Sequence, residues 1–360
     1  MMVMKARKPD IPLVDRLDLG RLRSLAIIGM GKNAGKTTVL NHILAACDRP
    51  GFARKLAVTS IGRDGEKEDL VTGGVKPRIY VKEDNLVATA RDSLNRCDAV
   101  LEILALTKMH TALGEVVIAR ARSNGYIELA GPSMAQDLAL CESLFRDAEP
   151  DCLLLIDGAL SRKSPAGGGL TQAVILVAGA ANAASVSEWV EETARQVSLL
   201  TLPALEEADR CACLDVSRDN KDVRAVIMGQ GQATIRRALE LASLVGSGKQ
   251  VAEALQPEDR LLLVRGAVTD RMVTELLSTD AMSGMTLAAE DGTRFFIGEK
   301  SLAKVKHRQV KLAVLHELIL PLVCVNPMRR DGSLADSDEL VGALSAVIDR
   351  PVADLGSALI

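Results

Sequence analysis

The stretch Gly29-Met30-Gly31-Lys32-Asn33-Ala34-Gly35-Lys36-Thr37-Thr38 decides the fold of this 360-residue chain. It follows an apolar run at residues 25–28 and precedes residues 39–44, whose apolar side chains recur at helical spacing. A strand, a loop of small residues ending in Gly-Lys-Thr and a helix together predict a phosphate-binding loop. Backbone N–H groups of such a loop, and the positive end of the helix dipole, favour a bound anion.

The loop residues have distinct expected roles. Lys36 is expected to reach the β- and γ-phosphates of a nucleotide, and the Thr37 hydroxyl to bind Mg²⁺. Met30 stands where the full pattern has glycine, and the flanking glycines are expected to supply the tight turn instead. An ordinary glycine-rich turn is the alternative, and the Gly-Lys-Thr-Thr ending disfavours it. The predicted nucleotide-binding residues are Gly29, Gly31, Lys32, Asn33, Ala34, Gly35, Lys36, Thr37 and Thr38.

Composition narrows the class of protein. Hydrophobic residues make up 48% of the chain and aromatic residues 2%, which predicts an aliphatic core of the kind found in buried parallel sheets. The net charge of −3 gives no electrostatic reason to expect direct nucleic-acid binding. The sequence has no secretory h-region and no run long enough to span a membrane, and its seven cysteines are scattered. We therefore expect a cytoplasmic protein with reduced thiols and no membrane partner.

Strands alternating with helices predict an α/β fold, with a mainly parallel sheet flanked by helices. The pattern restarts after residue 220, so a second, smaller α/β domain is expected. The predicted division is an N-terminal arm at 1–21, a P-loop nucleotide-binding domain at 22–220 and a C-terminal α/β domain at 221–360. Residues 87–106 and 235–245 are predicted to be helical, and 116–121 is predicted to form a hairpin with 126–129 through Asn124-Gly125.

Two aspartates follow predicted strands and are candidates for chemistry. Asp157 closes the apolar run 152–157, where a second acidic ligand for Mg²⁺ is needed, although Asp-Gly can simply turn the chain. Asp64 follows the strand predicted at 55–61 and is a further candidate for the metal shell or for positioning an attacking water. A solvated charged loop explains Asp64 equally well. The predicted catalytic residues are Lys36 and Asp64.

Several stretches in this order resemble one known family, the P-loop subunit (B subunit) of lysine 5,6-aminomutase reactivase from bacterial lysine-fermentation clusters. The resemblance covers roughly residues 22–180 and thins beyond them, where 265–270 and 325–327 remain similar. The stretches that carry it are residues 28–38, Thr59-Ser60-Ile61-Gly62-Arg63-Asp64-Gly65-Glu66, 76–80, 114–121, 127–133 and Asp157-Gly158-Ala159-Leu160-Ser161-Arg162-Lys163.

The resemblance implies an ATP-dependent helper that acts with a MutS-like ATPase subunit. Its client would be an adenosylcobalamin- and pyridoxal-phosphate-dependent aminomutase that inactivates during turnover, and Mg-ATP turnover would drive exchange of damaged cobalamin. The loop residues Gly31, Gly35, Lys36 and Thr37 match the family pattern directly. Asp64 and Asp157 stand at matching positions, and their roles are inferred.

Two other functions stay open. The loop is also similar to those of the proteins that form molybdopterin guanine dinucleotide and dethiobiotin, which implies a small-molecule kinase or ligase. Such an enzyme would need a catalytic lysine besides Lys36, for which Lys32 and Lys163 are the candidates. A regulatory module that binds nucleotide without hydrolysing it is the other alternative.

Overall fold

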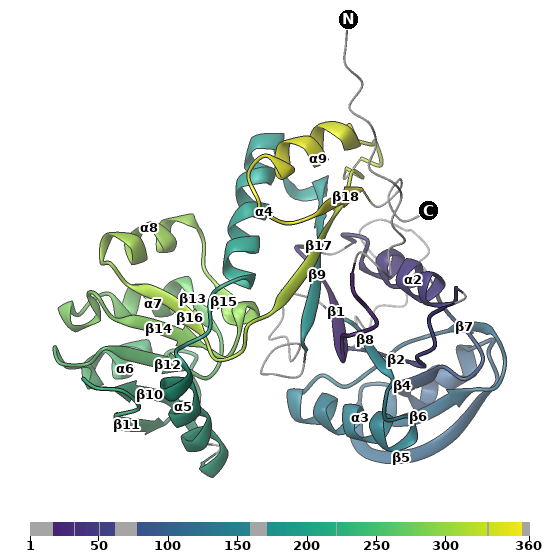
Figure 1. Ribbon diagram of the computed structural model, residues 1–360, viewed down its shortest axis with the longest axis horizontal. Helices are drawn as coiled ribbons and strands as arrows, with labels where there is room; N and C mark the ends of the chain where they lie inside the picture. The colour runs from purple at the N-terminus through teal and green to yellow at the C-terminus, as the bar shows by residue number, and fades with distance from the viewer. Residues whose placement is uncertain are drawn as a thin grey trace, which may run out of the picture.

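The computed structural model describes residues 17–31, 33–49, 51–61, 78–158, 171–220, 222–329 and 331–354. Within these residues, the main feature is a nine-stranded sheet with the order β18-β17-β9-β1-β8-β2-β4-β6-β5 (Figure 1). A separate five-stranded sheet has the order β11-β10-β12-β14-β16. The expected α/β class is confirmed, since helices flank a large mixed sheet.

The centre of the large sheet is parallel and buried. Strand β1 (Ser24–Gly29) pairs in parallel with β8 (Leu153–Asp157) on one side and with β9 (Ala173–Gly179) on the other. Strand β2 (Leu56–Ser60) pairs in parallel with β8. Apolar side chains on both faces of these strands are buried, which explains their continuous aliphatic sequences. The carboxyl ends of all four strands lie at one edge of the sheet.

Helices cover both faces of this central sheet. Helix α2 (Lys36–Cys47) packs its buried residues with the side chains of Leu25 and Ile27 on one face. Helices α3 (Ala135–Ala148), α4 (Val186–Leu200) and α9 (Ser337–Ser345) pack with Ala26 and Ile28 on the other. The alternation along β1 therefore divides the core into two layers. Among the described residues, every helix is too short or too polar to cross a lipid bilayer.

Strand β2 pairs in parallel with β4 (Leu86–Ala90), and beyond β4 the mainly parallel sheet becomes antiparallel. Strand β4 pairs with β6 (Gly114–Ala121), and β6 pairs with the edge strand β5 (Leu101–Thr111). The helix predicted at 87–106 is wrong, because β4 is buried on both faces and leaves no polar helical face. Only a short 3₁₀ segment, η1 (Arg91–Arg96), is helical there.

The hairpin predicted between 116–121 and 126–129 is also wrong. Strand β7 (Gly125–Ile127) pairs with β3 (Ile79–Val81) in a separate two-stranded ribbon, while β6 pairs with β4 and β5. The Asn124-Gly125 pair turns the chain out of the large sheet, so a local turn signal did not identify the partner strand.

The five-stranded sheet belongs to a unit at residues 207–314, called here the small-sheet unit. The helix predicted at 235–245 is wrong, because β11 pairs antiparallel with β10 at the edge of this sheet. The strands are β10 (Val223–Met228), β11 (Ile235–Glu240), β12 (Leu261–Val264), β14 (Thr286–Ala289) and β16 (Lys311–Val314), with the short β13 (Val268–Thr269) and β15 (Phe295–Phe296) forming a separate pair. The helices are α5 (Glu207–Asp219), α6 (Gly248–Ala254), α7 (Asp270–Leu276) and α8 (Glu299–His307), with 3₁₀ segments η3 (Asp280–Met282) and η4 (Gly292–Arg294); a further one, η2 (Ala180–Asn182), precedes α4.

The small-sheet unit is inserted into the large sheet, and this corrects the predicted division at residue 220. After β16 the chain returns through β17 (Ile319–Asn326), which pairs with β9, and β18 (Val352–Asp354) pairs with β17 (Figure 1). Residues 319–354 therefore belong to the large sheet, and helix α5 packs with the small one. Of the predicted arm at 1–21, residues 1–16 lie outside the described residues, while Leu17 and Leu19 are buried in the core.

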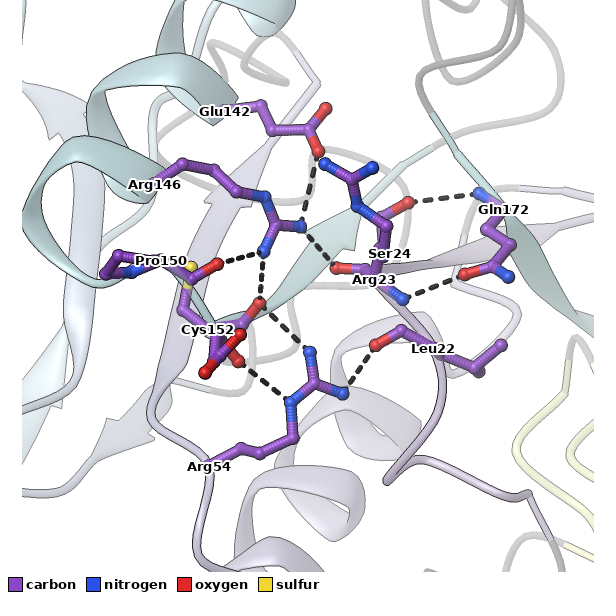
Figure 2. Close-up of polar contacts among 10 residues, drawn as sticks. Leu22, Arg23, Ser24, Arg54, Glu142, Arg146, Pro150, Cys152 and Gln172 are labelled. Atoms are coloured by element: carbon purple, nitrogen blue, oxygen red, sulfur yellow. Dashed lines mark hydrogen bonds and ion pairs between the residues drawn. The ribbon is translucent and has the colours of Figure 1, made fainter.

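Two arginine side chains bind backbone carbonyl groups at the end of the large sheet where β1 and β8 begin (Figure 2). The Arg146 guanidinium donates hydrogen bonds to the carbonyl oxygens of Cys152, at 2.8 Å, and Arg23, at 3.0 Å. The Arg54 guanidinium donates to the carbonyl oxygens of Leu22, at 2.6 Å, and Cys152, at 3.3 Å. These carbonyls lie just before β1 and β8, where strand pairing begins. Charged donors thus satisfy backbone acceptors at the sheet edge.

Replacing Arg54 with methionine keeps the aliphatic stem and removes the donors. We expect Arg54→Met to lower the free energy of unfolding by about 2–3 kcal/mol, because charged hydrogen bonds to partly buried carbonyls are lost. Urea denaturation measures the change. Arg21→Met is the matched control, since the Arg21 side chain is 86% exposed and lies 3.6 Å from Asp18, and its effect should stay within about 0.5 kcal/mol. Equal midpoints for the two variants would contradict the assigned role of Arg54.

Candidate functional site at the carboxyl edge of β1

The loop between β1 and α2 has the backbone of an anion-binding turn. Asn33 and Gly35 adopt left-handed conformations, with φ of 57° and 101°, and α2 begins at Lys36. Left-handed residues among right-handed ones direct successive N–H groups toward the same side. Gly35 is the N-cap of α2 and has no side chain with which to occupy the N–H groups of the first turn.

Ala34 is the anchored residue of this loop. It is 4% exposed, and a Cβ placed on Gly29 would lie 3.1 Å from its Cβ. A Cβ placed on Gly179, at the end of β9, would lie 3.4 Å from the Ala34 Cα. The Asn326 side chain, at the end of β17, donates a hydrogen bond from Nδ2 to the Ala34 carbonyl oxygen at 3.0 Å. Three neighbouring strands therefore hold the loop at Ala34.

Gly29 also allows Lys36 to fold back across the loop. A Cβ on Gly29 would lie 3.0 Å from Lys36 Cγ and 3.1 Å from Cδ, so the lysine stem passes directly over the glycine. The sequence assigned Gly29 a role in turning the chain, and the structure adds this close approach of the side chain. Any larger residue here would displace the lysine stem or the loop.

The structure brings together Thr37 and Asp157, two residues the sequence proposed for one metal. Thr37 Oγ1 donates a hydrogen bond to Asp157 Oδ2 at 3.1 Å, although 120 positions separate them in the chain. Asp157 ends β8, where it pairs in register with Ile27 of β1 and Ser60 of β2. The parallel register thus places the carboxylate beside the first turn of α2. A hydroxyl and a carboxylate here are oxygen donors of the type that Mg²⁺ accepts.

Two predicted site residues, Lys32 and Asp64, lie outside the described residues, as does Lys163. Strand β2, which precedes Asp64, ends beside Asp157: the Ile61 N–H donates to the Asp157 carbonyl oxygen at 2.8 Å. The positions of Gly31 and Thr38 are described, and both are half-buried next to the loop.

Met30, the departure from the phosphate-loop pattern, points its side chain out of the loop. Its backbone N–H continues the sheet by donating to the Val177 carbonyl oxygen at 3.1 Å. The Thr193 hydroxyl of α4 donates to Met30 Sδ at 3.5 Å, and the side chain packs against the core. Met30, Trp189 and Asn326 are among the residues lining a cavity of about 40 Å³ beneath the loop. A side chain directed away from the loop explains why glycine is not required at this position.

A larger cleft, of about 910 Å³, lies at the opposite edge of the large sheet. It is lined by Arg23 and Thr171 from this sheet and by Arg210 and His316 from the other side. Burial lowers the pKa of the His316 imidazole, and nearby Asp291 acts against this shift. Because Arg23 precedes β1 and the loop follows it, the length of β1 separates the cleft from the loop. No pattern in the sequence predicted this cleft.

Comparisons with known proteins cover only part of the chain. A segment of 88 residues is 36% identical to cyclic 2,3-diphosphoglycerate synthetase from Rubrobacter xylanophilus. The matched segment spans 24% of this chain and 19% of that protein, which is too little to place the chain in a family. No family model matches the chain, and no solved structure matches it.

The left-handed backbone at Gly35 gives a testable consequence. We expect Gly35→Ala to destabilise the protein by about 1–2 kcal/mol, because a Cβ is strained at φ of 101°. Gly342→Ala is the matched control: Gly342 lies inside α9 with no atom within 4 Å of an added Cβ, so alanine should stabilise by about 0.5–1 kcal/mol. Urea midpoints measure both. Stabilisation by both substitutions would refute the left-handed conformation of Gly35.

Proposed function

We propose that the β1–α2 loop binds the Mg²⁺ complex of a nucleoside triphosphate and that the protein hydrolyses ATP. The hydrogen bond between Thr37 and Asp157 carries the proposal. It holds a hydroxyl and a carboxylate together beside a helix N-terminus whose cap is glycine. A phosphate and its Mg²⁺ need this combination of N–H donors and oxygen ligands.

The position of the loop in the sheet supports the same proposal. The loop follows β1, which lies between the parallel strands β8 and β9. Ligands of open α/β sheets bind at the carboxyl ends of parallel strands. We therefore propose that the large sheet is a P-loop NTPase-like domain carrying the small-sheet unit as an insertion.

The residues of the chain would act by position and charge. The backbone amides from Gly35 onward and the Lys36 ammonium group would hold the phosphates and neutralise their charge. Thr37 and Asp157 would hold Mg²⁺, which when bound neutralises charge that develops on the phosphate oxygens. Asp64 remains our candidate for orienting the attacking water.

At the level of partners, we propose a reactivating factor for the adenosylcobalamin-dependent lysine 5,6-aminomutase. The support is the resemblance of residues 22–180 to the P-loop subunit of that reactivase. ATP turnover, together with a MutS-like ATPase subunit, would drive release of damaged cobalamin from the aminomutase. We propose a cytoplasmic location for this activity.

The partial similarity to cyclic 2,3-diphosphoglycerate synthetase favours a second candidate. The name of that relative describes formation of a small phosphorylated molecule. A small-molecule kinase or ligase would use the same loop, with phosphate passing to an acceptor rather than to water. A nucleotide-binding module without turnover is the remaining alternative.

A phosphate-release assay separates these functions. The protein is incubated with Mg-ATP alone, with the aminomutase, and with 2,3-diphosphoglycerate, the linear form of the product in the relative's name. Phosphate release stimulated by the aminomutase supports the reactivase. ADP formation, measured in the same samples and stimulated by the small acid, supports the kinase or ligase. Binding of ATP without release under any condition would rule out hydrolysis.

Lys36→Ala tests the central role of the loop. We expect the mutation to lower the rate of phosphate release about 100-fold or more, because the positive charge on the phosphates is lost. Lys300→Ala is the control, since Lys300 is exposed on α8 of the small-sheet unit. Circular dichroism checks that both variants fold. Unchanged release by folded Lys36→Ala would refute the site.

Asp157→Asn tests the metal ligand separately from the phosphate contacts. The amide retains the size of the side chain but has no negative charge for Mg²⁺. We expect the Mg²⁺ concentration for half-maximal phosphate release to rise about tenfold or more, while nucleotide binding without Mg²⁺ changes little. An unaltered Mg²⁺ dependence would exclude Asp157 as a ligand.

A further inference from the structure

Asn326 has both ends of its side-chain amide engaged. It is the last residue of β17 and is 8% exposed. Its Nδ2 donates to the Ala34 carbonyl oxygen at 3.0 Å, and its Oδ1 accepts from the Met328 N–H at 3.1 Å. Rotating the amide by 180° would oppose two oxygens at Ala34 and two N–H groups at Met328. The two hydrogen bonds therefore fix the orientation of the amide.

The contact with Ala34 determines the direction of a neighbouring N–H group. A trans peptide is planar, so the carbonyl oxygen of Ala34 and the N–H of Gly35 point in opposite directions. Because Asn326 holds the oxygen, the Gly35 N–H points away from β17. This N–H belongs to the amides that the proposed function assigns to the phosphates.

Packing places Ala34, and the hydrogen bond from Asn326 gives the carbonyl group of this peptide its direction. Ala34 lies between Gly29 and Gly179, whose missing Cβ atoms allow its close approach. Those contacts fix where Ala34 lies but exert no directional force on its carbonyl group. Asn326, which pairs in register with Gly179, donates the hydrogen bond that directs this carbonyl group.

We infer that Asn326 is a positioning residue for the nucleotide-binding loop, acting through the Ala34–Gly35 peptide. The claim that Asn326 affects nucleotide binding rests on the proposed function. The claim that Asn326 orients the Ala34–Gly35 peptide rests on the hydrogen bond alone. Strand β17 is also the strand by which the chain returns from the small-sheet unit. The amide geometry of the loop is therefore set by a residue 292 positions away, on the return strand.

The test compares Asn326→Asp and Asn326→Ala with Cys324→Ala. Aspartate places an oxygen against the Ala34 carbonyl oxygen, whereas alanine removes the donor. Cys324 is a fully buried residue of the same strand whose truncation weakens β17 without removing the contact with Ala34. If Asn326→Asp does not fold, Asn326→Ala carries the test alone.

The first measurement is hydrogen–deuterium exchange of the peptide containing residues 33–37, in protein without nucleotide. We expect exchange to be at least about tenfold faster in the Asn326 variants and unchanged in Cys324→Ala. The second is the affinity for Mg-ADP by calorimetry, which should fall about tenfold in Asn326→Ala, equivalent to one lost hydrogen bond, and further in Asn326→Asp.

The two measurements separate the inference from the proposed function. Exchange in the Asn326 variants that equals the wild type, or that equals Cys324→Ala, would overturn the positioning role whatever the affinities are. If the wild type does not bind Mg-ADP, the proposed function fails, and the exchange rates still decide whether Asn326 orders the loop.

Discussion

Strand β1 lies between two parallel neighbours, and the register of those pairings fixes where its last residues stand. Ile27 lies opposite Asp157 on one side, and Gly29 lies opposite Val177 on the other. A slip of one residue would move the carboxylate by about 3.3 Å along the strand and reverse the face on which it points. The 3.1 Å contact with Thr37 would then be lost. The site therefore depends on backbone pairing in the sheet before it depends on any side chain.

The parallel centre of the molecule could be predicted because its signals are local. Continuous aliphatic runs mark β1, β8 and β9, and the loop sequence marks the junction with α2. That Thr37 and Asp157 would be neighbours followed from one rule, that the carboxyl ends of parallel strands share an edge. The antiparallel part was not predictable in this way. The apolar spacing in residues 87–106 also fits a helix. These residues form β4 and β5 because both strands pair with β6, which is distant information that the local spacing does not contain.

The missed domain order and the missed residue Asn326 have the same physical cause. Strands 319–326 and 352–354 carry no local mark that distinguishes joining the first sheet from joining the second. The sequence pattern at Asn326 resembles that at Asp157. In each case a polar residue directly follows an apolar run, 322–325 for Asn326 and 152–156 for Asp157. The significance of Asn326 required knowing that β17 ends beside the loop.

The insertion also affects how this protein is made on the ribosome. Strand β9 is synthesised early and pairs with β1, but its other edge is covered only by β17, after the whole small-sheet unit has been translated. Until then the nascent chain presents an unpaired edge of aliphatic residues, a form prone to association with other chains. The strands of the small sheet are contiguous in the sequence, so this sheet can form before the large sheet is complete. The large sheet is thus completed late in biosynthesis. The unpaired edge of β9 is available to chaperones until then.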